Sequence, residues 1–139
     1  MNVTNLRIAS DNNKEIYVAH YGRIVAGFPK PSEDYTYDEI SLDKKYLYKK
    51  HTTYIATADG NSMEPTIYDK DELIIRTDLP VLNNSIIIAS INGEEYTCKR
   101  IDLEKKILIA DNKKFKAIEI DKIENFIILG VVKHIIRSL

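Results

Sequence analysis

The chain has 139 residues, which is enough for one domain with a single core and a short tail, and too few for a multidomain machine. Its composition is 44% hydrophobic with five glycines and four prolines, which excludes a low-complexity or fully disordered chain. Twenty basic residues face twenty-one acidic ones, so the chain lacks the broad positive field of a protein that binds DNA directly.

The single cysteine, Cys98, cannot form an internal disulfide, which suits a reducing cytoplasm. No cysteine or histidine cluster has the spacing of a metal site, so we expect neither a metal nor a cofactor. The first ten residues lack the features of a secretory signal, and no apolar run approaches the roughly 20 residues that span a bilayer. The sequence therefore indicates a cytoplasmic protein that has no membrane partner.

Residues 1–50 are polar and rich in tyrosine, and their apolar periodicity is poor. Such a stretch is typical of an arm that lies on a domain, although Asp38 to Tyr48 is compatible with a short helix or turn.

From His51 onward the chain consists of short β-branched and aromatic runs separated by turn residues. The seven runs are TTYIATA, DELIIRT, SIIIASI, EEYTCKRI, KILIA, KAIEI and FIILGVVKHII. Seven such runs at close spacing predict a mainly antiparallel β domain.

Two turns connect these runs into predicted hairpins. Asn92-Gly93 separates SIIIASI from EEYTCKRI, and this pair readily adopts the positive φ angles of a type I′ turn. A second hairpin is predicted around Asp111-Asn112. The last run, Phe126 to Ile136, is apolar on both faces and predicts a strand buried on both sides, in a core or in an interface.

The first candidate functional residue is Ser62, in the loop Asp59 to Ile67 between two predicted strands. Gly60 permits a tight turn and Pro65 fixes the backbone downstream, so the serine lies on a short rigid loop, where it can act as a nucleophile. The alternative is a turn serine that caps its own backbone.

Lys99 is the second candidate and follows Ser62 by 37 residues, inside a strand of the Asn-Gly hairpin. Strand alternation puts Thr97, Lys99 and Ile101 on one face, which is apolar around the lysine. A lysine withdrawn from water is neutral in part and can take a proton from a serine hydroxyl. The alternative is a solvated or snorkelling surface lysine.

The loop GNSMEPTI, the strand DELIIRT and the run Y-T-C-K-R together resemble the self-cleaving Ser-Lys proteins of the LexA, phage-repressor and UmuD family. The resemblance continues upstream in Gly22 to Gly27, because that family cuts its own chain at an Ala-Gly or Cys-Gly bond at a similar distance before the serine.

Two stretches, Gly27 to Tyr35 and Leu129 to Ile136, are similar to the UmuD branch, the accessory subunit of an error-prone translesion DNA polymerase. The short segment before Ala26 also matches UmuD rather than the helix-turn-helix proteins. The chain departs from the branch at Ala26, where UmuD has cysteine, and at Asp69-Lys70-Asp71, where the family has Asp-Gly-Asp.

The resemblance implies that Ser62 attacks the carbonyl of Ala26 while Lys99 acts as the base, and that the amine of Gly27 leaves. The backbone N–H groups of Ser62 and Met63 are the expected oxyanion donors. A flexible arm, residues 1–26, is then removed from a peptidase and dimerisation domain of curled antiparallel sheets, residues 27–139. The implied partners are a second copy of the chain, a RecA filament on single-stranded DNA and an UmuC-like polymerase subunit, in an SOS response without direct sequence-specific DNA binding.

Two alternatives stay open. The chain can be the C-terminal domain of a LexA-like or phage repressor that lacks its helix-turn-helix domain, or an inert binding module with a degenerate dyad. Signal peptidase shares the Ser-Lys chemistry but requires a membrane anchor, for which this sequence has no apolar run.

Other residues favour structural roles. His134 falls in the last predicted strand, and Cys98 alternates away from Lys99 and is expected to be packed. The acidic group Asp69, Asp71 and Glu72 fits no calcium loop and is expected to form a solvated turn.

Overall fold

The structure is a computed structural model that describes residues 1–9, 18–21, 38–49 and 51–139. The chain divides into two compact units, residues 11–48 and a larger unit made of residues 1–10 and 49–139. The large unit contains both Ser62 and Lys99 and therefore concerns function most directly.

The small unit contains a two-stranded antiparallel ribbon, β2 (Val18–Tyr21) with β3 (Asp38–Ser41). The helix α1 (Leu42–Tyr46) follows β3 directly and has two lysines in its last turn, where positive charge favours the helix dipole. The short helix predicted within Asp38 to Tyr48 is therefore confirmed, preceded by a strand.

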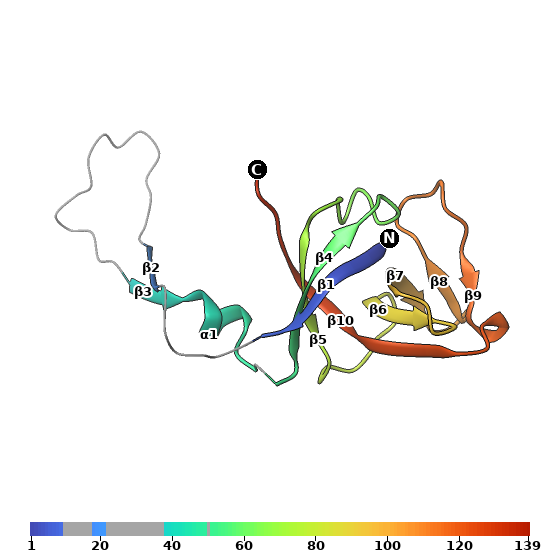
Figure 1. Cartoon of the computed structure of the whole chain (residues 1–139), viewed down its shortest axis with the longest axis horizontal. Helices are drawn as coiled ribbons and strands as arrows, with labels where there is room; N and C mark the ends of the chain where they lie inside the picture. The colour runs from blue at the N-terminus through green and yellow to red at the C-terminus, as the bar shows by residue number, and fades with distance from the viewer. Residues whose placement is uncertain (10–17, 22–37, 50) are drawn as a thin grey trace. The chain divides into compact units, whose positions relative to one another are not determined.

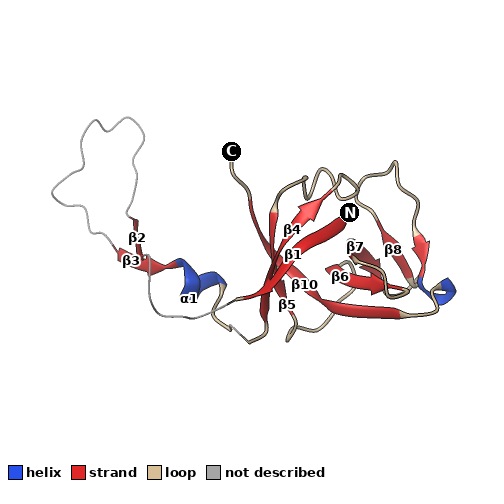
Figure 2. Cartoon of the chain, viewed as in Figure 1, coloured by secondary structure: helices blue, strands red, loops and turns tan. Residues whose placement is uncertain are grey.

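The regular secondary structure of the large unit is almost entirely β-strand, with loops between the strands (Figure 2). In chain order these are β1 (Asn2–Ile8), β4 (Thr53–Asp59), β5 (Glu72–Arg76), β6 (Ile86–Ile91), β7 (Tyr96–Asp102), β8 (Ile107–Ile109), β9 (Ile118–Glu119) and β10 (Phe126–Ile136). A 3-10 turn, η1 (Ile120–Lys122), follows β9. Each of the seven predicted runs contains a strand, and the mainly β class is confirmed.

The strands pair in the order β1-β4-β5-β10-β6-β7-β8-β9 (Figure 1), and every pairing is antiparallel. An additional pairing joins Asn2 of β1 to Thr97 of β7. This contact closes the first six strands of that order into a ring, from which β8 and β9 extend. Closure removes sheet edges that would otherwise be open to pairing.

Two hydrophobic clusters hold the sheet together. The first draws on all of β1, β4, β5, β6 and β7 and contains Met1, Val3, Ala56, Ala58, Met63, Ile67, Leu73, Ile75, Ile88 and Cys98. The second lies where β6, β7, β8 and β10 pack and contains Ile87, Ala89, Ile101, Leu108 and Val131. Since Ile87 and Ile88 are consecutive and both fully buried, β6 is covered on both faces.

The Asn-Gly hairpin is confirmed. Asn92 and Gly93 have φ angles of 54° and 73°, and the N–H of Glu94 donates to the carbonyl of Ile91 over 3.1 Å. These are the two positive φ angles that a type I′ turn requires. The second predicted hairpin is also present, because β8 and β9 pair antiparallel on either side of Asp111 and Asn112.

β10 is central in the sheet, between β5 and β6, and it contains a close backbone crossing. A Cβ atom at Gly130 would lie 2.5 Å from the carbonyl oxygen of Arg76, so only glycine fits there. Burial on both sides by the core is wrong for most of this strand, since Ile127 and Ile136 are 56% and 53% exposed. The other interpretation of this apolar strand, that it lies in an interface with another chain, stays a prediction.

β1 is a strand that the sequence did not predict. Its residues Asn2, Thr4 and Asn5 are exposed while Met1 and Val3 are buried, so the strand contributes little apolar pattern and is held mainly by pairing with β4.

Candidate active site

Ser62 lies in the loop between β4 and β5, which is fastened at both ends. Gly60, at a φ of 106°, donates its N–H to the carboxylate of Asp69 over 2.9 Å, and few residues other than glycine adopt that angle. Farther along, the carbonyl of Met63 accepts the N–H groups of Thr66 and Ile67, each over 2.9 Å. The side chains of Met63 and Ile67 are fully buried, so the loop is anchored in the core and holds Ser62 at 2% exposure.

Lys99 lies on β7 and its ammonium nitrogen is directed at Ser62. Its Nζ donates to the Ser62 Oγ over 3.3 Å, to the Thr97 Oγ1 over 3.2 Å and to the Cys98 carbonyl over 3.2 Å. The residue is 8% exposed, so it is neither a solvated nor a snorkelling lysine. The fold therefore brings together the two side chains that the sequence singled out.

A third group, which no sequence pattern indicated, lies beside Ser62 and Lys99. The amino group of Met1 donates to the Ser62 Oγ, and the Met1 carbonyl accepts the Cys98 N–H over 2.9 Å and the Thr97 hydroxyl over 2.7 Å. Burial, followed by the neighbouring Lys99, lowers the pKa of the Met1 amino group from 8.0 to about 5. Ser62 thus accepts hydrogen bonds from two amines at once.

The loop that follows β8 is hydrogen-bonded to the serine loop and supports it. The N–H of Asn112 donates to the Ser62 carbonyl over 2.9 Å, and its side-chain amide donates to the Asn61 carbonyl over 3.0 Å. Asp111 beside it binds Arg100 through two contacts of 2.8 and 2.7 Å and accepts the Thr66 hydroxyl over 2.6 Å. The sequence indicated Asp111 and Asn112 only as turn residues.

The expected oxyanion donors and the expected cut differ in how far the structure describes them. Within residues 51–139, neither the N–H of Ser62 nor the N–H of Met63 donates a hydrogen bond. Ala26 and Gly27 lie outside the described residues.

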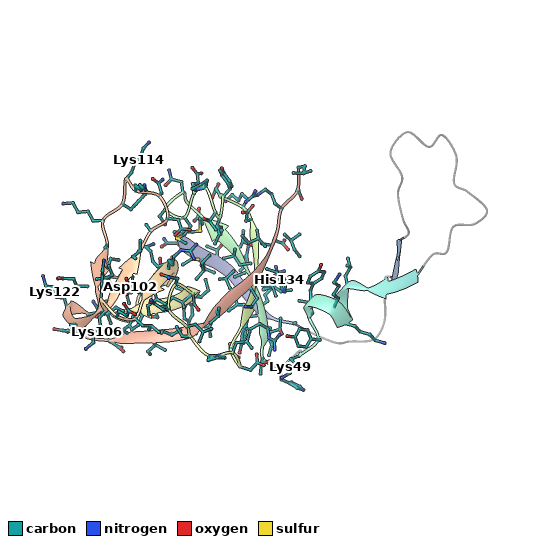
Figure 3. The ribbon with its side chains drawn as sticks, turned by 180° about the vertical axis from the view of Figure 1, so that it is seen from behind. Lys49, Asp102, Lys106, Lys114, Lys122 and His134 are labelled. Atoms are coloured by element: carbon teal, nitrogen blue, oxygen red, sulfur yellow. The ribbon has the colours of Figure 1, made fainter. Side chains whose placement is uncertain are left out.

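The residues given structural roles are placed as follows. Cys98 is fully buried, and burial raises the pKa of its thiol to about 12, so it is packed rather than reactive. His134 is exposed on β10 (Figure 3). The solvated turn expected at Asp71 is wrong, because Asp71 is 2% exposed and binds Arg137 through contacts of 2.7 and 2.6 Å. Arg137 reaches this carboxylate from beyond the end of β10, a pairing that no local pattern indicates.

Comparison with known proteins identifies the family. The model of the family described as Peptidase S24-like matches residues 9–133. The chain belongs to the Peptidase S24-like family. "Protein MucA" of Salmonella typhimurium is 36% identical over 115 residues, which cover 81% of this chain and 78% of that protein. "Protein ImpA" of Shigella flexneri is 32% identical over 120 residues, covering 83% and 79%.

A third S24 relative connects the chain to repressors. "LexA repressor 1" of Pseudomonas putida is 32% identical over 120 residues, which cover 84% of this chain and 58% of that protein. MucA and ImpA support a UmuD-like member of the S24 family, and together with LexA repressor 1 they support, more broadly, a self-cleaving serine peptidase. No helix in the described ranges is long and apolar enough to cross a membrane.

Proposed function

We propose that the chain cuts itself between Ala26 and Gly27, with Ser62 as the nucleophile and Lys99 as the general base. The observation that carries this proposal is the 3.3 Å contact between the Lys99 Nζ and the Ser62 Oγ, at a site where both residues are almost fully buried. A general base has to be a neutral amine when it accepts the serine proton.

The proposed reaction has two steps. Neutral Lys99 takes the Ser62 proton as the Oγ attacks the Ala26 carbonyl carbon, and the protonated amine then passes that proton to the Gly27 nitrogen as the peptide bond breaks. Water next attacks the resulting ester and gives one proton to Lys99, which returns it to Ser62 as the ester bond breaks. The acid released on Ala26 loses the second proton of that water to solvent and becomes a carboxylate.

The expected oxyanion donors fit this reaction. The N–H groups of Ser62 and Met63 belong to a loop that is fixed before the substrate arrives, by the Met63 and Ile67 side chains and by Asn112. Donors that need no rearrangement stabilise developing negative charge most effectively.

We further propose that cleavage serves the SOS response in the cytoplasm. The resemblance to UmuD supports stimulation by a RecA filament on single-stranded DNA and a homodimeric product, residues 27–139, that binds an UmuC-like translesion polymerase. The identity with MucA and ImpA over about four fifths of the chain supports this branch.

A second candidate is a self-cleaving repressor of the LexA type. It is favoured by one observation, the 32% identity with LexA repressor 1, of which the chain spans 58%. A native gene product with a helix-turn-helix segment before residue 1 would decide for the repressor.

Intact mass spectrometry of the purified chain, incubated near pH 7 and near pH 10, tests the cleavage. We expect a large fragment that begins Gly-Phe-Pro, formed faster at the higher pH, and no fragment from Ser62→Ala or Lys99→Ala. Two exposed residues, Ser138→Ala and Lys114→Ala, are the matched controls and should cut as the unchanged chain does. A Ser62→Ala chain that still cuts, or a fragment with another first residue, contradicts the proposal.

A further inference from the structure

The first residues of β1 lie between two strands that both lead to the catalytic pair. Asn2 pairs with Asp59 of β4 on one side and with Thr97 of β7 on the other. β4 runs directly into the serine loop, and β7 contains Lys99. Without these residues, β4 and β7 would present two open edges that converge on Ser62, which is the form of a groove for an extended peptide.

The direction of β1 makes it an occupant that Ser62 cannot cut. β1 is antiparallel to β4, so its amino end, and no carbonyl, meets the Ser62 Oγ. The nearest carbonyl, that of Met1, is held by the Cys98 N–H and the Thr97 hydroxyl. Figure 1 shows the amino terminus at this end of β1, alongside β4.

We propose that this groove is an interaction surface whose resident partner is the chain's own amino-terminal segment, residues 1–4, and that the segment to be cut reaches Ser62 only after that segment has left. This inference rests on the proposed self-cleavage and adds its regulation. The Met1 amino group fills the position beside the Oγ that the scissile carbonyl has to occupy, so the two peptides exclude each other.

The contacts of this segment are suited to reversible release. Met1 and Val3 are its buried side chains, at 8% and 6% exposure, and both belong to the core cluster inside the ring. The pairing with β4 breaks its register between Thr4 and Arg7, and Asn5 in that gap has a φ of 53°. Residues 1–4 can therefore separate without the pairs that Arg7 and Ile8 make with β4.

Release of residues 1–4 also changes the surroundings of the Met1 amino group. In the groove, burial and then the neighbouring Lys99 disfavour the charged form of the Met1 amino group, whereas in water the same amine regains its full hydration. Asp59 of β4 and Cys98 of β7 are the remaining titratable groups whose charge acts on it.

Val3→Asp tests the inference, with Thr4→Asp as its matched control. Val3 is buried and Thr4 is exposed on the same strand, so a carboxylate opposes docking only at the first position. If the segment holds the groove for nine tenths of the time, Val3→Asp should raise the rate of self-cleavage by about tenfold, with Thr4→Asp unchanged. Circular dichroism of each variant verifies that the domain stays folded.

A second measurement decides docking independently of cleavage. In a Ser62→Ala chain the Cys98 amide should be protected from hydrogen exchange, because its acceptor is the Met1 carbonyl, and adding Val3→Asp should remove that protection. Rapid exchange at Cys98 in Ser62→Ala alone, or a Val3→Asp rate equal to that of the unchanged chain, overturns the inference. Absence of cleavage in every variant near pH 10 overturns the proposed function instead, and leaves the exchange result to decide the docking.

Discussion

Lys99 can serve as a base because a lysine amine can lose its proton, and arginine in its place cannot. We expect Lys99→Arg to fold and to show no self-cleavage between pH 6 and pH 10, since a guanidinium stays charged throughout that range. In the unchanged chain self-cleavage should be faster at pH 10 than at pH 6, because only a neutral amine can accept the serine proton. Rates equal at both ends of this range would leave Ser62 as a turn residue.

Lys70 is the residue at which the chain departs from the Asp-Gly-Asp of its family, and it has a φ of 71°. A side chain in this left-handed region costs about 1–2 kcal/mol, part of which glycine loses again through the greater entropy of the unfolded chain. We expect Lys70→Gly to raise the free energy of unfolding by about 0.5–1 kcal/mol, measured by urea denaturation.

Lys114→Gly is the control for this change, since Lys114 is an exposed loop lysine without a positive φ (Figure 3). It should leave stability unchanged or lower it slightly. A Lys70→Gly chain no more stable than Lys114→Gly would show that the backbone at residue 70 is not strained.

At the scale of elements, the loop after β8 positions the serine loop through one side-chain amide. Asn112→Asp keeps an acceptor for the N–H of Lys114 but loses the donor to the Asn61 carbonyl. One lost hydrogen bond of about 1 kcal/mol corresponds to a rate about five- to tenfold lower if it acts on the serine's position. We expect this loss in self-cleavage with little change in the urea midpoint, and no loss in the neighbouring Lys113→Ala.

The segment after β10 is fastened to the turn before β5 by Arg137 and Asp71. Hydrogen bonds from Arg137 hold the pKa of Asp71 below its usual value, so this pair contributes stability above about pH 3.8, and the contribution is lost as the pH falls through the lowered pKa. We expect Arg137→Ala to lower the free energy of unfolding near pH 7, because it leaves the buried Asp71 carboxylate without this partner. The difference from the unchanged chain should narrow in acid, and a difference constant down to pH 2 would contradict the assignment.

The elements that sequence could predict are those with a local signal. The runs after His51 are dense in β-branched residues, and Asn92-Gly93 encodes its own turn, so both follow from the chain itself. Ser62 and Lys99 were found by their spacing and by resemblance to a family. Asn112 and Arg137 act through partners 51 and 66 residues away, and no local pattern specifies such a contact.

β1 is the strand that the sequence did not predict. Its stability comes from backbone pairing with β4 and β7, and any sequence can supply those hydrogen bonds. Only Met1, Val3 and the partly buried Leu6 pack against the core, which is too few apolar side chains to reveal a period of two residues.

At the scale of the whole molecule, β10 leaves apolar surface uncovered in a single chain. Ile127 and Ile136 are more than half exposed, and within this strand only Gly130 and Val131 are buried. We expect a homodimer, with this strand in the interface. Light scattering at tens of micromolar, before and after cleavage, should give twice the mass of the chain, and Ile127→Lys should shift it toward the monomer. A monomeric mass in the unchanged chain would contradict the interface.

Because β1 is part of the closed ring of strands, cutting of the chain and departure of the severed peptide are two separate events. Hydrolysis at the proposed bond would break the backbone, yet the severed peptide would still be paired with β4 through Arg7 and Ile8, and residues 1–4 would be free to dock again between β4 and β7. The nicked protein would therefore keep its shape until those pairs open, and dilution or a competing strand would set the pace of activation. A denaturing gel would report the first event, and a native mass spectrum the second.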